Sequence, residues 1–435
     1  MSVAAGCPVV VIAFDRSDYL RLTLESLVAQ VGAEVERRPI YLFQDGAVND
    51  FSGRQHCDPA TVAANVAIFQ SIIPHGTAMP APANLGVARN FQRAENFVFQ
   101  ELQSEAAIFL EDDLVLGPYY LKTLAKLIGL ALGDDRIGYV AAYGNHRASA
   151  EEQRRRRTEL MLLGHNWAFA LTRRQWLRQK PYVDQYMDIV GTSDYRGRDH
   201  ARIVQLFHSW GLGAPGTSQD IAKTHAAVLT QTAKINTFAC FGHYIGKQGL
   251  HFDPEQFKKM GFGDTAVMDE DIFELVPPSD EQLKKILDLS RASAMHENTA
   301  IPGFSTPSDT DRPAAARALL TEMLALRQAG RLSEAEAQCS VGMSRYPEYR
   351  DQYGHPAFLK EALRLTLMLR LRDRAVRLGE ELQRQVRPTD PCVPLLFGRH
   401  ARMTGDFVGA RQCAFEVLQL DPKNPEAAKW LEPAL

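Results

Sequence analysis

The chain has 435 residues, of which 45% are hydrophobic and 23% are charged. This length and composition predict a soluble protein of two or three globular domains with a sizeable core. The formal net charge of -3 argues against nucleic acid or an anionic membrane as the main partner.

The cysteines and the start of the chain indicate a cytoplasmic protein. The six cysteines are scattered, without a CxxC pair or the spacing of a zinc site, which predicts reduced thiols. The apolar stretch at residues 9–14 is too short for a signal peptide or a membrane span, and charged Asp15 and Arg16 follow it directly. We therefore expect neither secretion nor a membrane span.

The first half of the chain alternates strand-like and helix-like segments, which predicts an α/β fold with a parallel sheet covered by helices. The expected strands are residues 9–14, 39–43, 108–110 and 137–142. The expected helices are residues 19–31, 61–73, part of 84–102, and 120–132. Ser17 is a candidate cap for the first of these helices.

The pattern is weaker after residue 142. The arginine run at residues 154–157 follows two glutamates, which predicts a mobile charged loop rather than a phosphate site. Residues 167–171 indicate a short strand or a buried turn, and residues 182–218 lack a clear period. Residues 295–313 have the composition of a linker.

The last part of the chain is helical and repetitive. Gly330 is followed by Ala335 and Pro347, and the same offsets recur in Gly405, Ala410 and Pro422. A degenerate copy fits between them, with Ala375 and Pro388 at the equivalent places. Residues 397–425 resemble a tetratricopeptide repeat. We predict a first domain at residues 1–295, a linker at 296–312, and about three helical hairpins in an all-α domain at 313–435.

Polar groups follow several predicted strands. Glu111, Asp112 and Asp113 come at the end of the strand at residues 108–110, and such a triplet alone would more often be an ordinary polar turn. Three adjacent carboxylates repel one another unless a cation neutralises them, and their oxygens suit magnesium or manganese.

Two other strand ends carry charge. Asp15 and Arg16 follow the first strand and Asp45 follows the second. Because ligands bind at the carboxyl ends of strands in open α/β sheets, this set indicates a nucleotide site. Neither GxGxxG nor GxxxxGK[ST] is present, so we predict neither a dinucleotide fold nor a P-loop.

As an ordered set, these motifs resemble the GT-A glycosyltransferases, and most closely the inverting N-acetylglucosaminyltransferase I family. The resemblance covers roughly residues 8–255 and rests on residues 10–17, 44–46 and 111–114 with Pro118. Asn84, Leu85 and Gly86, with Asn90, are similar to a donor-side loop of bacterial family 2 relatives. The resemblance implies a Rossmann-like, mixed and mostly parallel sheet flanked by helices.

The resemblance also implies roles for individual residues. The position of Arg16 meets the donor diphosphate in that family, that of Asp45 meets uracil, and that of Asp113 binds manganese. Glu111 and Asp112 hold the sugar and the ribose, so the triplet is the equivalent of the DxD motif. The other expected donor-binding residues are Ala13, Phe14, Asp15, Asn84, Arg89 and Asn90.

An inverting transferase needs a base that takes a proton from the acceptor. Asp220 lies in a segment that resembles the base-bearing turn of the family, although capping a helix is an equally good explanation of it. Asp194 and Asp199 are the substitutes for Asp220 as the base if the match between this segment and the family is shifted along the chain.

Three further residues are candidates for the donor site. The glycine-containing segment at residues 241–251 is typical of a flexible lid, in which Lys247 could stabilise the leaving nucleotide and His251 could bind phosphate or the metal. Trp167 matches an aromatic turn that borders the sugar pocket in related enzymes. A structural histidine and a core tryptophan remain the alternatives for His251 and Trp167.

We therefore predict a Mn²⁺-dependent (or Mg²⁺-dependent) inverting glycosyltransferase that uses a UDP-sugar, with UDP-GlcNAc suggested by the resemblance alone. The acceptor is expected to be a hydroxyl group of a glycan or a protein. The helical repeats are expected to bind a protein partner, or to dimerise. The alternatives are a catalytically inactive domain in a repeat-based scaffold and a sugar-nucleotide nucleotidyltransferase.

Overall fold

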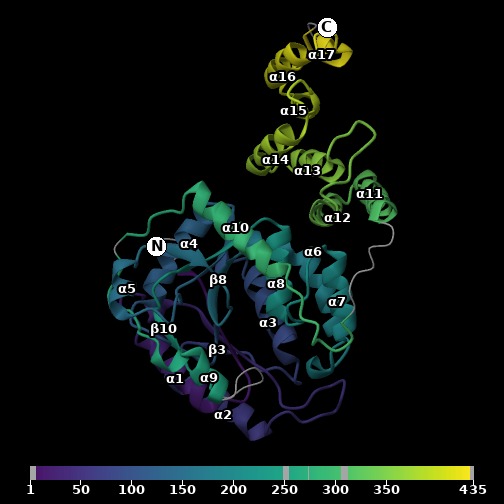
Figure 1. The fold of residues 1–435 in the computed structure, drawn as a ribbon. Helices are drawn as coiled ribbons and strands as arrows, with labels where there is room; N and C mark the ends of the chain where they lie inside the picture. Colours follow the sequence, from purple (N-terminus) through teal and green to yellow (C-terminus); the bar gives the residue numbers. More distant parts are fainter. Residues whose placement is uncertain (1–5, 248–253, 273, 305–311, 432–435) are drawn as a thin grey trace. The chain divides into compact units, whose positions relative to one another are not determined.

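The computed structural model describes residues 6–247, 254–272, 274–304 and 312–431 (Figure 1). The chain divides into two compact units. The first unit comprises Met1–Leu206 and Gly213–Ser305, and the second comprises Phe207–Leu212 and Thr306–Leu435. A sheet forms the centre of the first unit, and the second is built from helices.

The first unit contains an eight-stranded sheet in the order β3-β2-β1-β4-β8-β6-β9-β7. The strands are β1 (Val9–Ala13), β2 (Ile40–Gln44), β3 (Thr77–Ala78), β4 (Ala106–Glu111), β6 (Ile137–Ala141), β7 (Leu160–Leu162), β8 (Ala168–Thr172) and β9 (Ala233–Thr237). Strands β1 to β4 pair in parallel, as do β6 and β9, whereas β8 is antiparallel to both β4 and β6, and β7 to β9. The predicted mixed, mostly parallel sheet is confirmed.

Helices cover both faces of the sheet. Successive side chains of a strand point to opposite sides, so an apolar strand such as β1 presents apolar side chains to both faces. Val9 and Val11 of β1 pack into one apolar cluster with residues of α1, α2, α4 and α10, and Val10 packs into a second cluster with residues of α3, α6 and α8. The helices of this unit are α1 (Ser17–Val28), α2 (Pro59–Ile72), α3 (Gly86–Asn96), α4 (Tyr120–Gly133), α5 (Ala150–Arg155), α6 (Arg173–Val190), α8 (Gln219–Leu229), α9 (Pro254–Met260) and α10 (Asp280–Ala294). Helix α7 (His200–Ser209) begins in this unit, and its residues from Phe207 on are assigned to the second.

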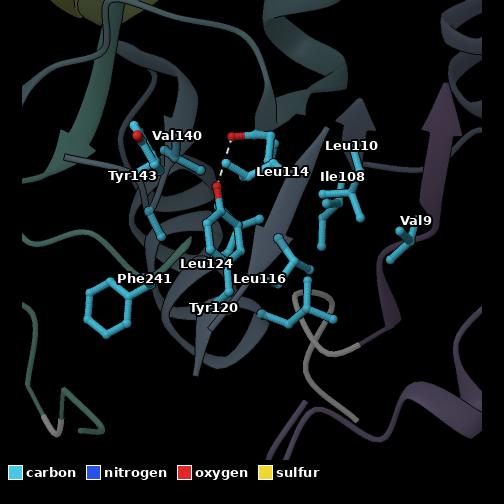
Figure 2. Packing of buried hydrophobic residues seen from close by; sticks show 14 of the residues in the cluster. Val9, Ile108, Leu110, Leu114, Leu116, Tyr120, Leu124, Val140, Tyr143 and Phe241 are labelled. Carbon is cyan, nitrogen blue, oxygen red and sulfur yellow. Dashed lines mark hydrogen bonds between the residues drawn. The ribbon is translucent and has the colours of Figure 1, made fainter. Parts of the chain in front are cut away.

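A small second sheet joins the end of β4 to the core. Its strands β5 (Leu114–Leu116) and β10 (Gly242–Tyr244) are antiparallel. Figure 2 shows Leu114, Leu116 and Tyr120 packed with Leu124 in the same cluster, and the Tyr120 hydroxyl donates to the Ala168 carbonyl oxygen at 3.0 Å. The chain that follows the acidic triplet is therefore anchored in apolar packing.

Leu124→Ala is expected to lower the free energy of unfolding of the first unit by about 2–5 kcal/mol, because it leaves a cavity in this cluster. Leu124 is fully buried. Leu22→Ala on α1 makes the same chemical change at a side chain that is 46% exposed, and its effect should stay within about 0.5 kcal/mol. Equilibrium urea unfolding checks both, and equal losses would contradict the packing described here.

Two local predictions were wrong. Ser17 does not cap α1: the helix begins at this residue, and the Ser17 hydroxyl donates to Asn65 Oδ1 at 2.6 Å. The arginine run is not wholly a loop either, since α5 extends to Arg155. Ser149 caps α5 by accepting from the Glu152 amide, and Arg154 Nε donates to a Glu270 carboxylate at 2.7 Å. Arg154 and Arg155 lie in the last turn of α5, where cationic side chains interact favourably with the helix dipole.

A buried histidine on α8 makes the stability of the first unit depend on pH. His225 is 1% exposed, one ring nitrogen lies 2.8 Å from the Gly213 carbonyl oxygen, and burial lowers its pKa to about 4. The unfolded chain therefore binds a proton near pH 6.5 that the folded chain binds only near pH 4, so stability falls as the pH drops through this window.

When the pH falls from 7 to 5, this effect of His225 lowers the free energy of unfolding by about 2 kcal/mol. His225→Gln removes the effect, so its free energy of unfolding is expected to fall by about 2 kcal/mol less than that of the native chain. His75→Gln, at an exposed histidine, should leave the pH dependence unchanged. Urea unfolding at the two pH values checks this, and an unchanged pH dependence in His225→Gln would contradict it.

The second unit consists of successive helices that pack on their neighbours: α11 on α12, α13 on α14, and α15 on α16. Their bounds are α11 (Arg312–Gln328), α12 (Leu332–Arg345), α13 (Ala357–Met368), α14 (Arg372–Gln385), α15 (Cys392–Met403), α16 (Phe407–Leu420) and α17 (Pro425–Leu431). Gly330 and Gly405 lie in the turns with φ of 73° and 79°, in the left-handed region that favours glycine. Among the described helices of the chain, none has the length and apolar character that crossing a membrane requires.

Candidate active site

A pocket of about 440 Å³ lies where β1, β2 and β4 end. The carboxyl ends of parallel neighbours meet at one edge of a sheet, which is why residues far apart in sequence converge here. The pocket is lined by Ile12, Ala13, Phe14, Asp15, Arg16, Asp45, His56, Asn84, Gly86, Val87, Asn90, Glu111, Asp112, Asp113, Trp167, Asp194, Tyr195, Arg196, Ser218, Gln219, Asp220, Tyr244 and Gly246.

Arg16 holds two of the acids that follow β4. Its Nη1 donates to Asp113 Oδ2 at 2.7 Å, and its Nη2 donates to Asp112 Oδ1. Burial alone would lower the pKa of Arg16, but these two carboxylates raise it above its usual value. The backbone fixes the acids in turn, since the Asp112 carbonyl oxygen accepts from the Thr23 hydroxyl at 3.0 Å and that of Asp113 accepts from the Ile245 amide at 2.9 Å.

The acidic cluster keeps unused acceptors. Asp112 Oδ2 and Asp113 Oδ1 are buried and accept no hydrogen bond from the described residues. Burial, together with the charges of Asp113 and Asp220, raises the pKa of Glu111 well above its usual value, and burial raises that of Asp112 to about 6 although Arg16 opposes it. Buried carboxylate oxygens without partners fit a hard divalent cation.

Asp45 organises the loop that follows β3. Its carboxylate accepts from the Leu85 amide at 2.7 Å and the Gly86 amide at 2.9 Å, and Asn84 Nδ2 lies 3.2 Å from Oδ2. The side-chain amide of Asn90 donates to the Phe43 carbonyl oxygen at 2.9 Å. These polar side chains line the pocket and also form hydrogen bonds with the surrounding backbone, which fixes their positions.

An aromatic wall stands beside the acids. The rings of Trp167 and Tyr244 are stacked, with centroids 4.0 Å apart and planes at 11°, and His165 stacks on Trp167 at 4.8 Å. Gly246 approaches the acids closely, because a Cβ there would lie 2.8 Å from Asp113 Oδ2. A side chain at this position would therefore fill the space next to the metal candidate.

Asp220 lies at the first turn of α8, whose cap is Ser218. Asp220 Oδ1 accepts from Asn166 Nδ2 at 2.9 Å and from Gln219 Nε2. The helix cap is thus supplied by Ser218, and the Asp220 carboxylate faces the pocket.

Most of the predicted site residues line this pocket, whereas two of the described ones, Arg89 and Lys247, do not. Arg89 is outside the lining, with Nη1 3.6 Å from Asp50 Oδ1 and its guanidinium over the Phe51 ring. Lys247 follows the lining residue Gly246, and its Nζ is 5.9 Å from the centre of the Phe257 ring. His251 lies outside the described residues.

Sequence reasoning missed one wall of the pocket. His56, Tyr195 and Arg196 line it, and His56 Nε2 lies 2.8 Å from Asp194 Oδ2. Asp194 entered the sequence analysis only as a substitute base. These residues come from irregular segments without a periodic pattern or a motif, so no signal in the sequence pointed to them.

One family of known proteins is similar to the part of the chain that carries this pocket. The model of the GNT-I family matches residues 2–161, a stretch that contains β1, β2, β4 and the acidic triplet. The predicted similarity to this family is confirmed for that stretch. No curated protein matches the chain.

Two solved structures are distantly similar to the chain. The Mycobacterium tuberculosis glucosyl-3-phosphoglycerate synthase, in complex with Mn²⁺, UDP and glucosyl-3-phosphoglycerate, has 11% identity and a TM-score of 0.30 over 60% of this chain and 77% of its own. S. aureus TarS 1–349 has 11% identity and a TM-score of 0.32 over 95% of this chain and 91% of its own. TM-scores of this size do not establish a common fold.

Proposed function

We propose that this protein is a metal-dependent inverting glycosyltransferase that moves a sugar from a UDP-sugar to a hydroxyl group of a glycan or a protein. GlcNAc is the sugar we favour, from the GNT-I family match. The observation that carries the proposal is a pair of buried oxygens, Asp112 Oδ2 and Asp113 Oδ1, that accept no hydrogen bond from the described residues and share a pocket with Arg16 and Asp220. This combination supplies a cation site, a phosphate ligand and a base within one cavity.

Asp113 and Asp112 would hold Mn²⁺ or Mg²⁺, with Glu111 beside them. Mn²⁺ and UDP are bound in the mycobacterial structure described above, and the hard carboxylate donors here suit the same ion. When bound, the cation would neutralise negative charge on the donor diphosphate. Ala13, Phe14, Asp15 and Asp45 would surround the nucleoside, and Asn84 and Asn90 would lie on the same side of the pocket.

Asp220 would act as the base. It takes the proton of the acceptor hydroxyl as the acceptor oxygen bonds to the anomeric carbon and the bond from that carbon to the diphosphate breaks. The pair of electrons of the broken bond leaves with UDP. Attack on the face opposite to the leaving group inverts the anomeric configuration.

Arg16 would have two roles. It neutralises Asp112 and Asp113 through the ion pairs described above. Its guanidinium would also offer the donor diphosphate the bidentate hydrogen bonds that arginine prefers to make with phosphate.

Thermal shift measurements with a panel of nucleotide sugars test this function. The proposal expects a UDP-sugar to raise the unfolding temperature in the presence of Mn²⁺ and to have little effect with EDTA. GDP-, CMP- and ADP-sugars serve as matched ligands. A protein that no UDP compound stabilises, with or without Mn²⁺, would not be this enzyme.

We also propose that the helical unit presents a protein or glycan acceptor, since stacked helical hairpins form extended binding surfaces. A chain that ends before residue 313 is then expected to lose transfer to the acceptor while it hydrolyses the UDP-sugar at about the native rate. Transfer and donor hydrolysis are measured on the same preparations. Equal loss of both reactions would contradict acceptor presentation by this unit.

A further inference from the structure

A buried lysine lies behind the proposed base. Lys234 of β9 is 2% exposed, and its Nζ donates to Thr224 Oγ1 at 2.8 Å and to Asn166 Oδ1 at 3.2 Å. The other end of the Asn166 amide donates to Asp220 Oδ1 at 2.9 Å. A continuous chain of hydrogen bonds therefore runs from Lys234 through Asn166 to Asp220.

The charge of this lysine has no direct counter-ion. Among the described residues, no carboxylate oxygen lies within salt-bridge distance of Lys234 Nζ, whereas the neighbouring buried Lys223 is paired with Glu95 at 2.5 Å. Burial lowers the pKa of Lys234 to about 8; the charge of Asp220 opposes this shift and that of Lys223 adds to it. Burying an unpaired ammonium is costly, so a purely structural site would be better served by an apolar side chain.

The ammonium dictates which way the Asn166 amide points. A lysine can only donate, so the amide oxygen must face Lys234 and the amide nitrogen must face Asp220. Asp220 Oδ1 is then occupied by Asn166 and Gln219. Asp220 Oδ2 accepts no hydrogen bond from the described part of the chain and belongs to a pocket-lining residue.

We propose that Lys234 and Asn166 are positioning residues that hold Asp220 with Oδ1 anchored and Oδ2 directed at the acceptor hydroxyl. Lys234 polarises the amide of Asn166, and the amide fixes the rotation of the carboxylate. The inference rests on the proposed role of Asp220 as the base. It adds that the geometry of the base is set by Lys234, a buried residue outside the pocket lining, through Asn166.

The test uses the full chain and Lys234→Met, which removes the ammonium and keeps the length of the side chain. The reaction is UDP release from UDP-GlcNAc with Mn²⁺, in which water takes the place of the acceptor. Lys234→Met is expected to lower kcat by about 10- to 100-fold, as misplacement of a catalytic group does, with an unchanged KM for the donor. In the Asp220→Asn background the same substitution should have no further effect, since there is no base left to position.

A buried control separates positioning from general loss of structure. Glu95→Gln with Lys223→Met replaces the neighbouring buried pair without touching the hydrogen bonds of Asp220, and kcat should stay within about twofold of native. An unchanged kcat in Lys234→Met, or equal losses with and without Asp220, would overturn the positioning role. A native rate in Asp220→Asn would instead overturn the proposed base, so the two failures are distinguishable.

Crystal structures of the native chain and Lys234→Met give a readout that needs no turnover. The native crystal should show the hydrogen bond between Asn166 and Asp220, and the variant should show Asp220 rotated or in more than one conformer. An unmoved, fully ordered Asp220 in the variant would refute the proposal even if no sugar nucleotide is hydrolysed.

Discussion

Asp113→Ala is expected to abolish the Mn²⁺-dependent stabilisation of this protein by a UDP-sugar. Asp113 Oδ1 is a buried pocket oxygen that accepts no hydrogen bond from the part of the chain that the structure describes, and without it the cation would lose a carboxylate ligand. A ligand present at about 100 times its Kd contributes about 2.7 kcal/mol of stability, and this contribution should disappear. Thermal unfolding with UDP-GlcNAc, with and without Mn²⁺, measures it.

The matched control is Asp184→Ala on α6, which also removes a carboxylate paired with a cationic side chain, here Lys180 at 2.8 Å. It lies outside the pocket lining, so the shift produced by the donor should remain. Retention of the full Mn²⁺-dependent shift in Asp113→Ala would show that the metal is bound elsewhere. Without metal, Asp113→Ala should still fold, because Arg16 keeps its bond to Asp112.

Asp220→Asn is expected to lower kcat by about 10²- to 10⁴-fold, the usual contribution of a general base. The amide has the size of the carboxylate and its oxygen can still accept from Asn166 and Gln219, so binding of UDP should be unchanged. UDP release and isothermal titration with UDP and Mn²⁺ measure the two effects.

Asp199→Asn is the control for the base, because Asp199 is one of the two substitute bases, with Asp194, that the sequence offered. It lies outside the pocket lining and accepts from the Arg202 amide at the start of α7, so kcat should be close to native. Asp194 lines the pocket but is held by His56 and by Ser52 at 2.8 Å each. A larger loss in Asp194→Asn than in Asp220→Asn would reassign the base.

Four strands of the large sheet, β1, β2, β4 and β6, were predicted because each leaves a strong local signal. Strand β8 was expected only as a short strand or a buried turn, and β3, β7 and β9 were not predicted. Residues 9–13 and 106–110 are apolar and buried on both faces, which is typical of a strand covered by helices on both sides. The stretch at residues 182–218 gave no such signal, since α6 contains an internal Pro181 and α7 is joined to it by irregular chain. Two of its pocket-lining residues, Tyr195 and Arg196, were therefore not predicted from the sequence.

Composition and strand-end motifs by themselves determined the α/β class, the acidic cluster and many of the side chains around it. These follow from short-range rules: the period of apolar residues defines a strand, and the residue after a parallel strand faces the ligand edge. Arg89 shows the limit of such reasoning. It lies on α3 between the motif residues Gly86 and Asn90, yet its side chain pairs with Asp50 outside the pocket.

Only the tertiary structure decided how the charges are partnered. It placed Arg16 on Asp112 and Asp113, left one oxygen of each acid without a hydrogen bond, and set Lys234 behind Asp220 through Asn166. The physical reason is that electrostatic energies and hydrogen bonds depend on distances of a few ångströms between residues of different strands. Spacing along the chain does not contain those distances.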